Sequence, residues 1–223
     1  MKPVWTPWVL VCLAGTLTGC LSSGSTAVLE SIQRIASERS SVVLDEALVR
    51  STNAGVLRVS LDHKPPVFFE LASIHPSRYL LSFVSVDGAV IQLFNGQIRG
   101  THRLGSDIVK VAALADDPFD QGFTQIHPSK RYYWQITAPE AGSNLVAQSR
   151  YQIIDQAPIQ TLYGKWDTRL VEEKWSIDDL GYTATNYYWV DQNGLVVQST
   201  QTPLPDSMTF HMRLESYQPQ VDP

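Results

Sequence analysis

Cysteine is scarce in this sequence of 223 residues: the two that occur, Cys12 and Cys20, both lie within the first twenty positions. The rest of the chain has no thiol for a disulfide framework or for a cysteine-based zinc site. Basic residues are also few, with 17 Lys and Arg against 22 Asp and Glu and a net charge of -5. This balance lacks the positive surface that a phosphate backbone requires, so we exclude nucleic acid as a partner.

Local catalytic signatures are missing as well. The sequence contains no G-x-S-x-G elbow, H-E-x-x-H pair, P-loop or G-x-G-x-x-G turn. We interpret the scattered histidines, Asp116, Asp117 and Asp120 beside Pro118, and residues 172–174 as solvated surface. We therefore expect no catalytic residue, no metal and no cofactor, although a triad built from distant residues stays open.

The first twenty residues carry the most specific signal in the chain. Lys2 precedes an interrupted apolar stretch over residues 4–17, which is too short to span a membrane and is typical of a secretory signal peptide. Residues 17–20, Leu-Thr-Gly-Cys, resemble a bacterial lipobox, in which the cysteine is acylated and becomes the new N-terminus. We predict cleavage of residues 1–19 and attachment to a membrane through lipidated Cys20. An ordinary signal peptide with a chance cysteine, or a buried apolar helix, is the alternative.

The residues after the lipobox predict where the protein is held. Residues 20–26 comprise the lipidated cysteine and a flexible spacer, whose reach of roughly 13 Å keeps the body close to the bilayer. Leu21 stands where Asp would retain a lipoprotein in the inner membrane, so resemblance to lipoprotein sorting in enteric bacteria implies the periplasmic face of the outer membrane. Cleavage would also remove Lys2, leaving 16 basic and 22 acidic residues. Attachment would then depend on lipid and not on a basic patch.

The body of the chain has the pattern of a β protein. Residues 27–39 have apolar side chains at three- and four-residue steps, which predicts one N-terminal amphipathic helix. Short segments rich in β-branched and aromatic residues then alternate with turn residues. These candidate strands are residues 56–61, 67–74, 79–86, 89–94, 97–103, 108–114, 131–137, 149–154, 160–163, 170–176, 183–190, 195–200 and 208–217. The fold is therefore predicted to be mainly β, with antiparallel coiled sheets forming a sandwich or a partly open barrel.

Turn residues indicate how the strands are connected. Three pairs predict type I′ hairpins, in which both central residues take positive φ: Asp87-Gly88, Asn95-Gly96 and Asn193-Gly194. Residues 115–130 are rich in Asp, Gly and Pro and should form a long loop. We expect a single β-rich domain over residues 27–217, with 115–130 as the best place for a break between lobes, and a frayed tail over 218–223.

Aromatic residues are concentrated in one part of the chain. All tryptophans after Cys20 lie between residues 132 and 189, as do most tyrosines. Such rings stack on sugars or anchor protein partners. However, strand side chains alternate between faces, so in residues 132–134 and 187–189 the middle ring points away from its neighbours, and many of these rings can be core. The candidate surface for a glycan or partner consists of Tyr133, Trp134, Trp166, Trp175, Tyr188 and Trp189.

Two stretches of the body resemble a known family. One covers residues 86–101 and continues into 104–108, and the other covers 186–191 and is followed by Gly194, Val196, Ser199 and Gln201. With the lipobox, they resemble the YjbF/GfcB family of outer-membrane lipoproteins, which is associated with exopolysaccharide and group 4 capsule production. The resemblance implies a largely β protein without a known enzymatic role, encoded beside an outer-membrane β-barrel partner.

We therefore predict a non-catalytic lipoprotein that helps to assemble or export a polysaccharide by binding an outer-membrane β-barrel protein or a glycan. Two other functions stay open. A lipid or lipoprotein carrier would hold an acyl chain in an apolar cavity. A glycan-processing enzyme would place two carboxylates about 5–9.5 Å apart in an aromatic cleft.

Overall fold

The computed structural model describes residues 55–75, 80–123, 126–162 and 164–216. The elements in chain order are β1 (Val56–Leu61), β2 (Val67–His75), β3 (Leu80–Ser85), β4 (Val90–Phe94), β5 (Gln97–His102), β6 (Lys110–Ala113), η1 (Pro118–Gln121), β7 (Tyr132–Ala138), β8 (Gly142–Gln156), β9 (Ile159–Thr161), β10 (Gly164–Trp166), β11 (Thr168–Ile177), η2 (Asp178–Leu180), β12 (Tyr182–Asp191), β13 (Val196–Gln201) and β14 (Phe210–Ser216). The predicted signal peptide, Cys20, the spacer, the helix over residues 27–39 and the tail over 218–223 lie outside the described residues.

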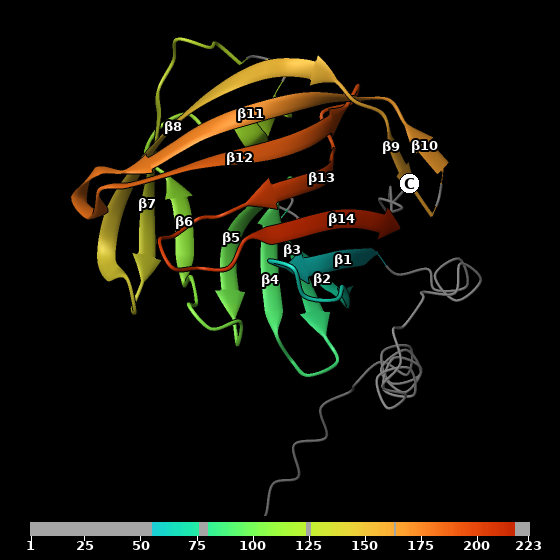
Figure 1. Ribbon diagram of the computed structural model, residues 1–223, viewed down its shortest axis with the longest axis horizontal. Helices are drawn as coiled ribbons and strands as arrows, with labels where there is room; N and C mark the ends of the chain where they lie inside the picture. Colours follow the sequence, from blue (N-terminus) through green and yellow to red (C-terminus); the bar gives the residue numbers. More distant parts are fainter. Residues whose placement is uncertain (1–54, 76–79, 124–125, 163, 217–223) are drawn as a thin grey trace, which may run out of the picture.

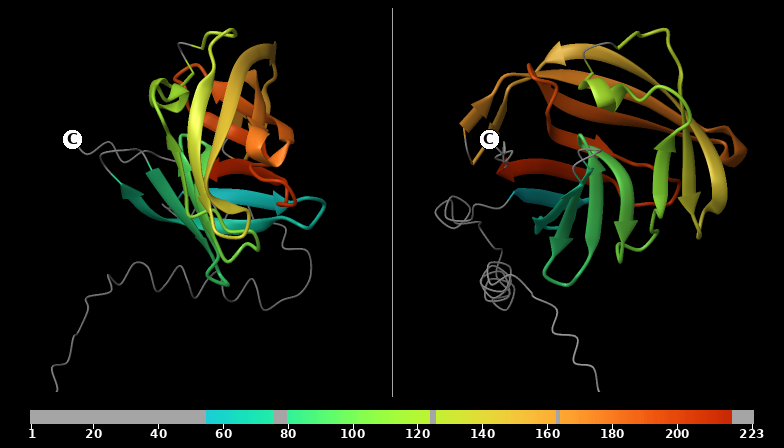
Figure 2. Two further views of the ribbon diagram at one scale, coloured as in Figure 1. Left: turned by 90° about the vertical axis from the view of Figure 1, so that its left-hand side faces the viewer. Right: turned by 180° about the vertical axis from the view of Figure 1, so that it is seen from behind.

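Twelve of these strands form one antiparallel sheet in the order β5-β4-β3-β2-β1-β14-β13-β12-β11-β8-β7-β6, and β9 and β10 form a separate hairpin. The sheet curls round until its two edges, β5 and β6, approach each other (Figures 1 and 2). Between the edges, the Thr101 backbone N–H donates to the Ile108 carbonyl oxygen at 2.8 Å, and Thr101 Oγ1 accepts from the Ile108 N–H at 2.9 Å. The mainly β, antiparallel prediction is confirmed in the form of a nearly closed barrel.

The β1–β14 pair lies in the middle of the sheet order. Strands β1 to β5 are successive neighbours, and the strands from β6 onward return to β14, which pairs with β1. Arg58 on β1 therefore lies opposite Arg213 on β14, although the two residues are far apart in the sequence. This pairing joins the first and last strands of the described chain and assembles a surface that neither strand could form alone.

The hairpin predictions are confirmed as connections, but only one of them has the predicted turn type. At Asn95-Gly96, both residues have positive φ, of 42° and 83°, as a type I′ turn requires. The other two turns have positive φ at Gly88 and Gly194 but not at the preceding residue. Each closes a three-residue loop, because those glycines occupy the left-handed position that follows a type I turn.

The loop between β6 and β7 fills the interior of the barrel. Asp117 caps η1 by accepting from the Phe119 N–H at 3.0 Å, and Pro118 follows at the first helical position. Phe119 and Phe123 then lie edge to face with ring centroids 4.5 Å apart, and both rings contact Tyr151 and Tyr188. These four rings are at most 2% exposed, so this part of the interior is packed with side chains.

The two stretches that carry the family resemblance meet in the structure. Gln201 on β13 donates from Nε2 to the Gly96 carbonyl oxygen at 2.7 Å and accepts from the Ile98 N–H at 3.1 Å. Asn95 donates to the carbonyl oxygens of Phe119 and Gly194 at 3.3 and 2.9 Å. These residues join the β4–β5 turn, the interior loop and the β12–β13 turn. Their role is structural, because they hold these three segments together.

Candidate functional site

The structure divides the six aromatic residues that the sequence suggested as one surface. Trp134, Trp175 and Tyr188 are buried, at 0, 4 and 0% exposure, because their alternation along β7, β11 and β12 points them into the barrel. For these three residues the surface prediction is wrong. Trp134 donates to Ser149 Oγ at 2.8 Å and Trp175 to the Pro203 carbonyl oxygen at 3.1 Å, so both indole N–H groups are satisfied inside the protein.

The other three aromatic residues reach the surface at separate places. Tyr133 is 42% exposed on the outer face of β7, whereas Trp166 and Trp189 are partly buried on β10 and β12. The predicted alternation is confirmed, because Tyr187 and Trp189 flank inward-pointing Tyr188 on the outer face of β12. Trp189 and Tyr187 lie 6.5 Å apart between ring centroids. They form the aromatic edge of a larger polar surface.

Strand pairing places this aromatic edge beside a row of planar polar side chains. Trp189 lies opposite Gln198, Gln198 opposite Arg213, and Arg213 opposite Arg58. Residues opposite each other in an antiparallel pair share a face, so this row crosses four strands, spaced about 4.8 Å apart. A second row of opposed residues crosses the same four strands and consists of Tyr187, Thr200, His211 and Ser60. We call these eight residues the cross-strand patch.

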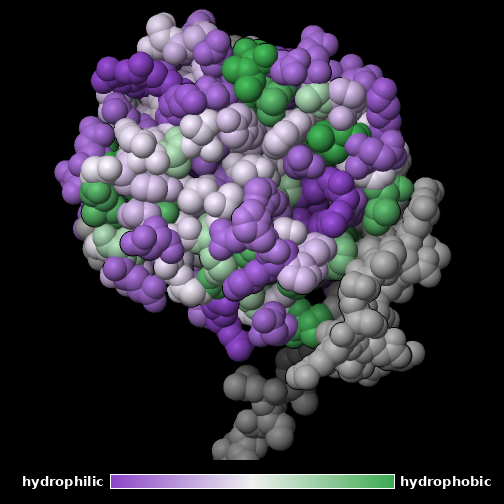
Figure 3. Space-filling view, viewed as in Figure 1, coloured by the Kyte–Doolittle hydropathy of each residue, from purple (hydrophilic) through white to green (hydrophobic). Residues whose placement is uncertain are grey.

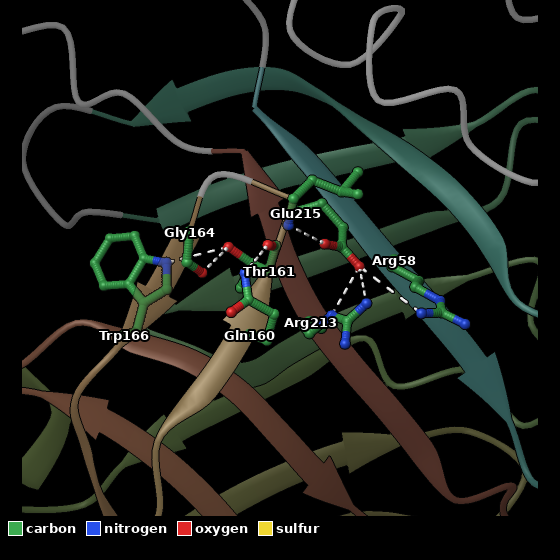
Figure 4. Close-up of polar contacts among 8 residues, drawn as sticks. Arg58, Gln160, Thr161, Gly164, Trp166, Arg213 and Glu215 are labelled. Carbon is green, nitrogen blue, oxygen red and sulfur yellow. Dashed lines mark hydrogen bonds and ion pairs between the residues drawn. The ribbon is translucent and has the colours of Figure 1, made fainter.

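A buried carboxylate orients one of the two arginines in the patch (Figure 4). Glu215, two residues after Arg213 on β14, is 2% exposed and accepts from Arg213 Nε at 2.7 Å and Nη2 at 2.5 Å. Its other oxygen accepts from the Leu162 N–H at 3.3 Å, where the β9–β10 hairpin lies over β14. Arg58 Nη1 lies 3.9 Å from the same carboxylate. Arg213 is therefore held firmly, whereas Arg58 is held loosely.

The cross-strand patch contains a shallow pocket of about 160 Å³ between β1, β13 and β14. The residues that line it are Arg58, Ser60, Gln198, Ser199, Thr200, His211, Met212 and Arg213. Small-molecule pockets usually measure about 300–1,000 Å³, so this one suits a single chemical group of an extended ligand that lies along the sheet. Hydrophobic side chains on the face in Figure 3 occur as small separate clusters among polar ones. An extended polar ligand fits such a surface better than an apolar protein partner does.

A second hollow, of about 370 Å³, is lined by the aspartates of residues 115–120 with His127, Lys130 and Tyr132. Lys130 Nζ lies 2.5 Å from Asp116 and lowers the pKa of that carboxyl. Asp117 forms an ion pair with Arg99, whose guanidinium lies over Trp134 at 4.9 Å, so the prediction of a fully solvated turn is wrong at Asp117. Burial raises the pKa of Asp117 and Arg99 opposes the rise. Each of these two carboxylates thus already has a cation partner.

Glu173 is a further exception to the predicted solvated surface, because it is wholly buried inside the barrel. Its carboxylate accepts from Tyr151 Oη at 2.5 Å, Tyr188 Oη at 2.8 Å and Asn186 Nδ2 at 2.8 Å. Burial raises the pKa of Glu173, and these three hydrogen bonds oppose the rise. The surrounding rings pack closely, so this network is a feature of the core and not an accessible site.

Two kinds of feature do not occur in the described part of the chain. Among those residues, no group of three or more His, Cys, Asp and Glu side chains is arranged to hold a metal ion. No described helix is long and apolar enough to cross a membrane.

Of the eight residues of the cross-strand patch, the sequence prediction included only Trp189. Alternation alone places Arg58 with Ser60 on one face of a strand, and His211 with Arg213 on one face of another. That signal was present, but no local pattern shows that β1 and β14 are neighbours.

Comparison with protein families agrees with this architecture. The family described as "Group 4 capsule polysaccharide lipoprotein gfcB, YjbF" matches residues 26–214. The chain belongs to the YjbF/GfcB family. The match covers nearly all the described strands, so this protein is a member of a family of capsule polysaccharide lipoproteins. The family description names no catalytic activity. No protein among those with curated functions matches the sequence.

A solved structure of low sequence identity shares the fold of this YjbF/GfcB member. The hypothetical lipoprotein YmcC from Escherichia coli K12 superposes with a TM-score of 0.74 at 16% identity, over 89% of this chain and 97% of that chain. A protein from Bacteroides fragilis, described as exported with a YmcC-like fold, has 12% identity and a TM-score of 0.36 over 73% of this chain and 93% of that chain. A lipoprotein from Parabacteroides distasonis has 13% identity and a TM-score of 0.37, over 74% and 95%.

Proposed function

We propose that this protein is a non-catalytic lipoprotein of the outer membrane that assists the assembly or export of a capsule or exopolysaccharide by binding the glycan on its cross-strand patch. In this proposal residues 1–19 are removed, Cys20 is acylated, and residues 20–26 connect the lipid to a periplasmic body over residues 27–217. Membership of a capsule polysaccharide lipoprotein family supports the process. The cross-strand patch supports the mode of binding.

The combination of groups in the patch carries this proposal. A partly exposed tryptophan offers an apolar face on which the C–H face of a sugar ring can stack. Gln198 and the two arginines lie beside it along one row, where they can donate hydrogen bonds to hydroxyl and ring oxygens. A sheet face with stacking rings at one end and donors along its length suits an extended carbohydrate chain.

The environments of Asp116, Asp117 and Glu173 support a binding function more than catalysis. A glycosidase needs one carboxyl with a raised pKa as its general acid and a second carboxylate facing it across the substrate. In the acidic hollow, Lys130 lowers the pKa of Asp116, and Asp117 is occupied by Arg99 and by the cap of η1. Glu173 has a raised pKa but lies within packed aromatic side chains.

The packed interior also favours glycan binding over an acyl-chain carrier. A carrier requires an apolar cavity inside the barrel. Phe119 and Phe123 enter the interior from the loop between β6 and β7. Both rings contact Tyr151 and Tyr188, and Phe119 also contacts Trp134. An acyl chain could enter this region only if the loop moved out.

An outer-membrane β-barrel protein is the second partner in this proposal. Exposed apolar side chains gather on the outer surface near β7, where Leu114, Tyr133 and Val146 are 53, 42 and 45% exposed. The Leu114 N–H donates to the Tyr133 carbonyl oxygen at 2.9 Å, so these two residues are neighbours. Exposed apolar groups of this kind are typical of protein-binding surfaces. Glycan and protein would then occupy different parts of the molecule.

The proposal is tested by complementation of a strain that lacks the gene, with surface polysaccharide as the measurement. Wild-type protein and Trp189→Phe, which keeps an aromatic face, should restore the polysaccharide. Trp189→Ala should reduce it severalfold, and Cys20→Ser should reduce it by removing the lipid. Immunoblots of envelope fractions control for the amount of each protein. Unchanged surface polysaccharide in the deletion strain itself would reject the function.

A further inference from the structure

The cross-strand patch has a local charge opposite in sign to that of the whole chain. The protein carries a net charge of -5, yet its patch holds two guanidinium groups and an exposed histidine. The residues that line its pocket include no Asp or Glu, and Glu215 beside it supplies one negative charge. Two guanidinium groups therefore face one carboxylate at this pocket.

Of the two guanidinium groups, that of Arg58 is the less tightly paired with Glu215. Glu215 accepts two hydrogen bonds from Arg213, whose side chain is 27% exposed. Arg58 is 3.9 Å from that carboxylate, and its side chain is 39% exposed. Its guanidinium can therefore turn toward a ligand at little cost, and its planar fork matches a carboxylate.

The Trp189 ring and the Arg58 guanidinium lie on one row of the sheet. Trp189 and Arg58 are separated by three strand spacings, which amount to about 14 Å. Gln198 and Arg213 fill the interval. One ligand that touches both ends must be extended, and it must carry a sugar face at one end and an anion at the other.

We infer that the cross-strand patch binds an acidic glycan, in which a sugar ring stacks on Trp189 and a sugar carboxylate pairs with Arg58 at the β1–β14 pocket. This inference rests on the proposed function and adds the chemical class of the glycan. Gln198, Thr200 and His211 lie between or beside these two groups and donate to or accept from the intervening hydroxyls.

The test uses the full-length lipidated protein in detergent and two matched probes. Galacturonate oligomers present the carboxylates, and the same oligomers with every carboxyl methyl-esterified present an identical but neutral backbone. Calorimetric titration should show tighter binding of the acidic oligomer, by about tenfold, and this preference should shrink as salt is raised. Equal binding of the two oligomers, or binding of neither, would overturn the inference.

Three variants assign the binding to the patch. Arg58→Gln should lower affinity for the acidic oligomer about tenfold and leave the esterified oligomer unaffected, whereas Trp189→Ala should weaken both. Arg150→Gln, which removes the same charge from the outer face of β8, should have no effect. Melting temperatures confirm that each variant is folded. Equal losses in Arg58→Gln and Arg150→Gln would contradict the inference, as would full affinity in Arg58→Gln.

Further outcomes separate this inference from the proposed function. If Trp189→Ala lowers surface polysaccharide in cells but Arg58→Gln does not, the function stands and the acidic class is wrong. If acidic oligomers bind through Arg58 but the deletion strain keeps its polysaccharide, the site stands and the function is wrong. Arg58-dependent binding to phosphatidylglycerol vesicles without oligomer binding would assign the patch to a membrane surface and overturn the inference.

Discussion

Glu173 has a fully buried carboxylate that accepts hydrogen bonds from neutral side chains: two tyrosine hydroxyls and one asparagine amide. An ionised carboxylate without a cation is costly in a low-dielectric interior, and the hydrogen bonds recover only part of that cost. The pKa of Glu173 is therefore raised from its ordinary value near 4.5. A raised pKa in the folded state means that folding favours the protonated form.

We predict a pH dependence of stability that is specific to Glu173. Because the folded protein binds this proton more tightly than the unfolded chain, the contribution of Glu173 is fully present below about pH 4.5 and is lost as the pH rises through the raised pKa. Glu173→Gln, which cannot ionise, should remove this part of the slope. Urea unfolding of both proteins between about pH 5 and 8 measures the difference. Parallel profiles would show that Glu173 does not titrate in this range.

A second substitution at this position separates the effect of the Glu173 charge on stability from the effect of its hydrogen bonds. Glu173→Ala would leave Tyr151, Tyr188 and Asn186 with buried polar groups that have lost their acceptor. Each such group costs about 1–3 kcal/mol, so Glu173→Ala should be less stable than Glu173→Gln by about 3 kcal/mol or more.

At the scale of elements, the interior loop and the β12–β13 turn meet through two glycines. Gly122 ends η1 with φ of 55°, and a Cβ built there would lie 2.7 Å from the Gly194 Cα. That neighbour is backbone and cannot move aside as a side chain could. The close approach lets the loop that carries Phe119 and Phe123 dock in the barrel.

Gly122→Ala should therefore lower the free energy of unfolding by more than the cost of placing alanine in a left-handed conformation. Gly181, which ends η2 with φ of 59°, is a matched control because a Cβ there meets nothing within 4 Å. Both substitutions incur the left-handed penalty of about 1–2 kcal/mol, and only Gly122→Ala also separates the two turns. Denaturant midpoints compare them. Equal losses would mean that the contact with Gly194 contributes nothing.

The accuracy of the sequence predictions differs between strands and their pairing. Alternation and turn residues located most strands to within a few residues, and β1 with the predicted bounds, because both signals are local. The strand predicted over residues 149–154 is only part of β8, which begins at Gly142, and β10 was missed because three residues carry too little pattern. Pairing of β1 with β14 depends on closure of the whole barrel. Half of the cross-strand patch was therefore beyond local reasoning.

At the scale of the whole molecule, aromatic side chains pack part of the barrel interior, and the proposed glycan surface lies on its outside. The nearly closed sheet satisfies most strand edges, and aromatic side chains fill the region that a cavity-type binding protein would leave open. The strands from β12 to β1 then offer a polar and aromatic outer face, while Tyr133 and its apolar neighbours lie near β7. Two separate surfaces would allow one lipoprotein to hold a glycan and a protein partner together.

The saccharide that copurifies with the full-length protein from envelopes of polysaccharide-producing cells tests the central claim most directly. Acid hydrolysis and sugar analysis of equal amounts of purified protein measure it. We expect capsule or exopolysaccharide sugars with the wild-type protein, a severalfold lower amount with Trp189→Ala, and an unchanged amount with Arg150→Gln, which changes an exposed residue outside both proposed surfaces. Equal sugar on the wild-type protein and Trp189→Ala, or none on either, would contradict it.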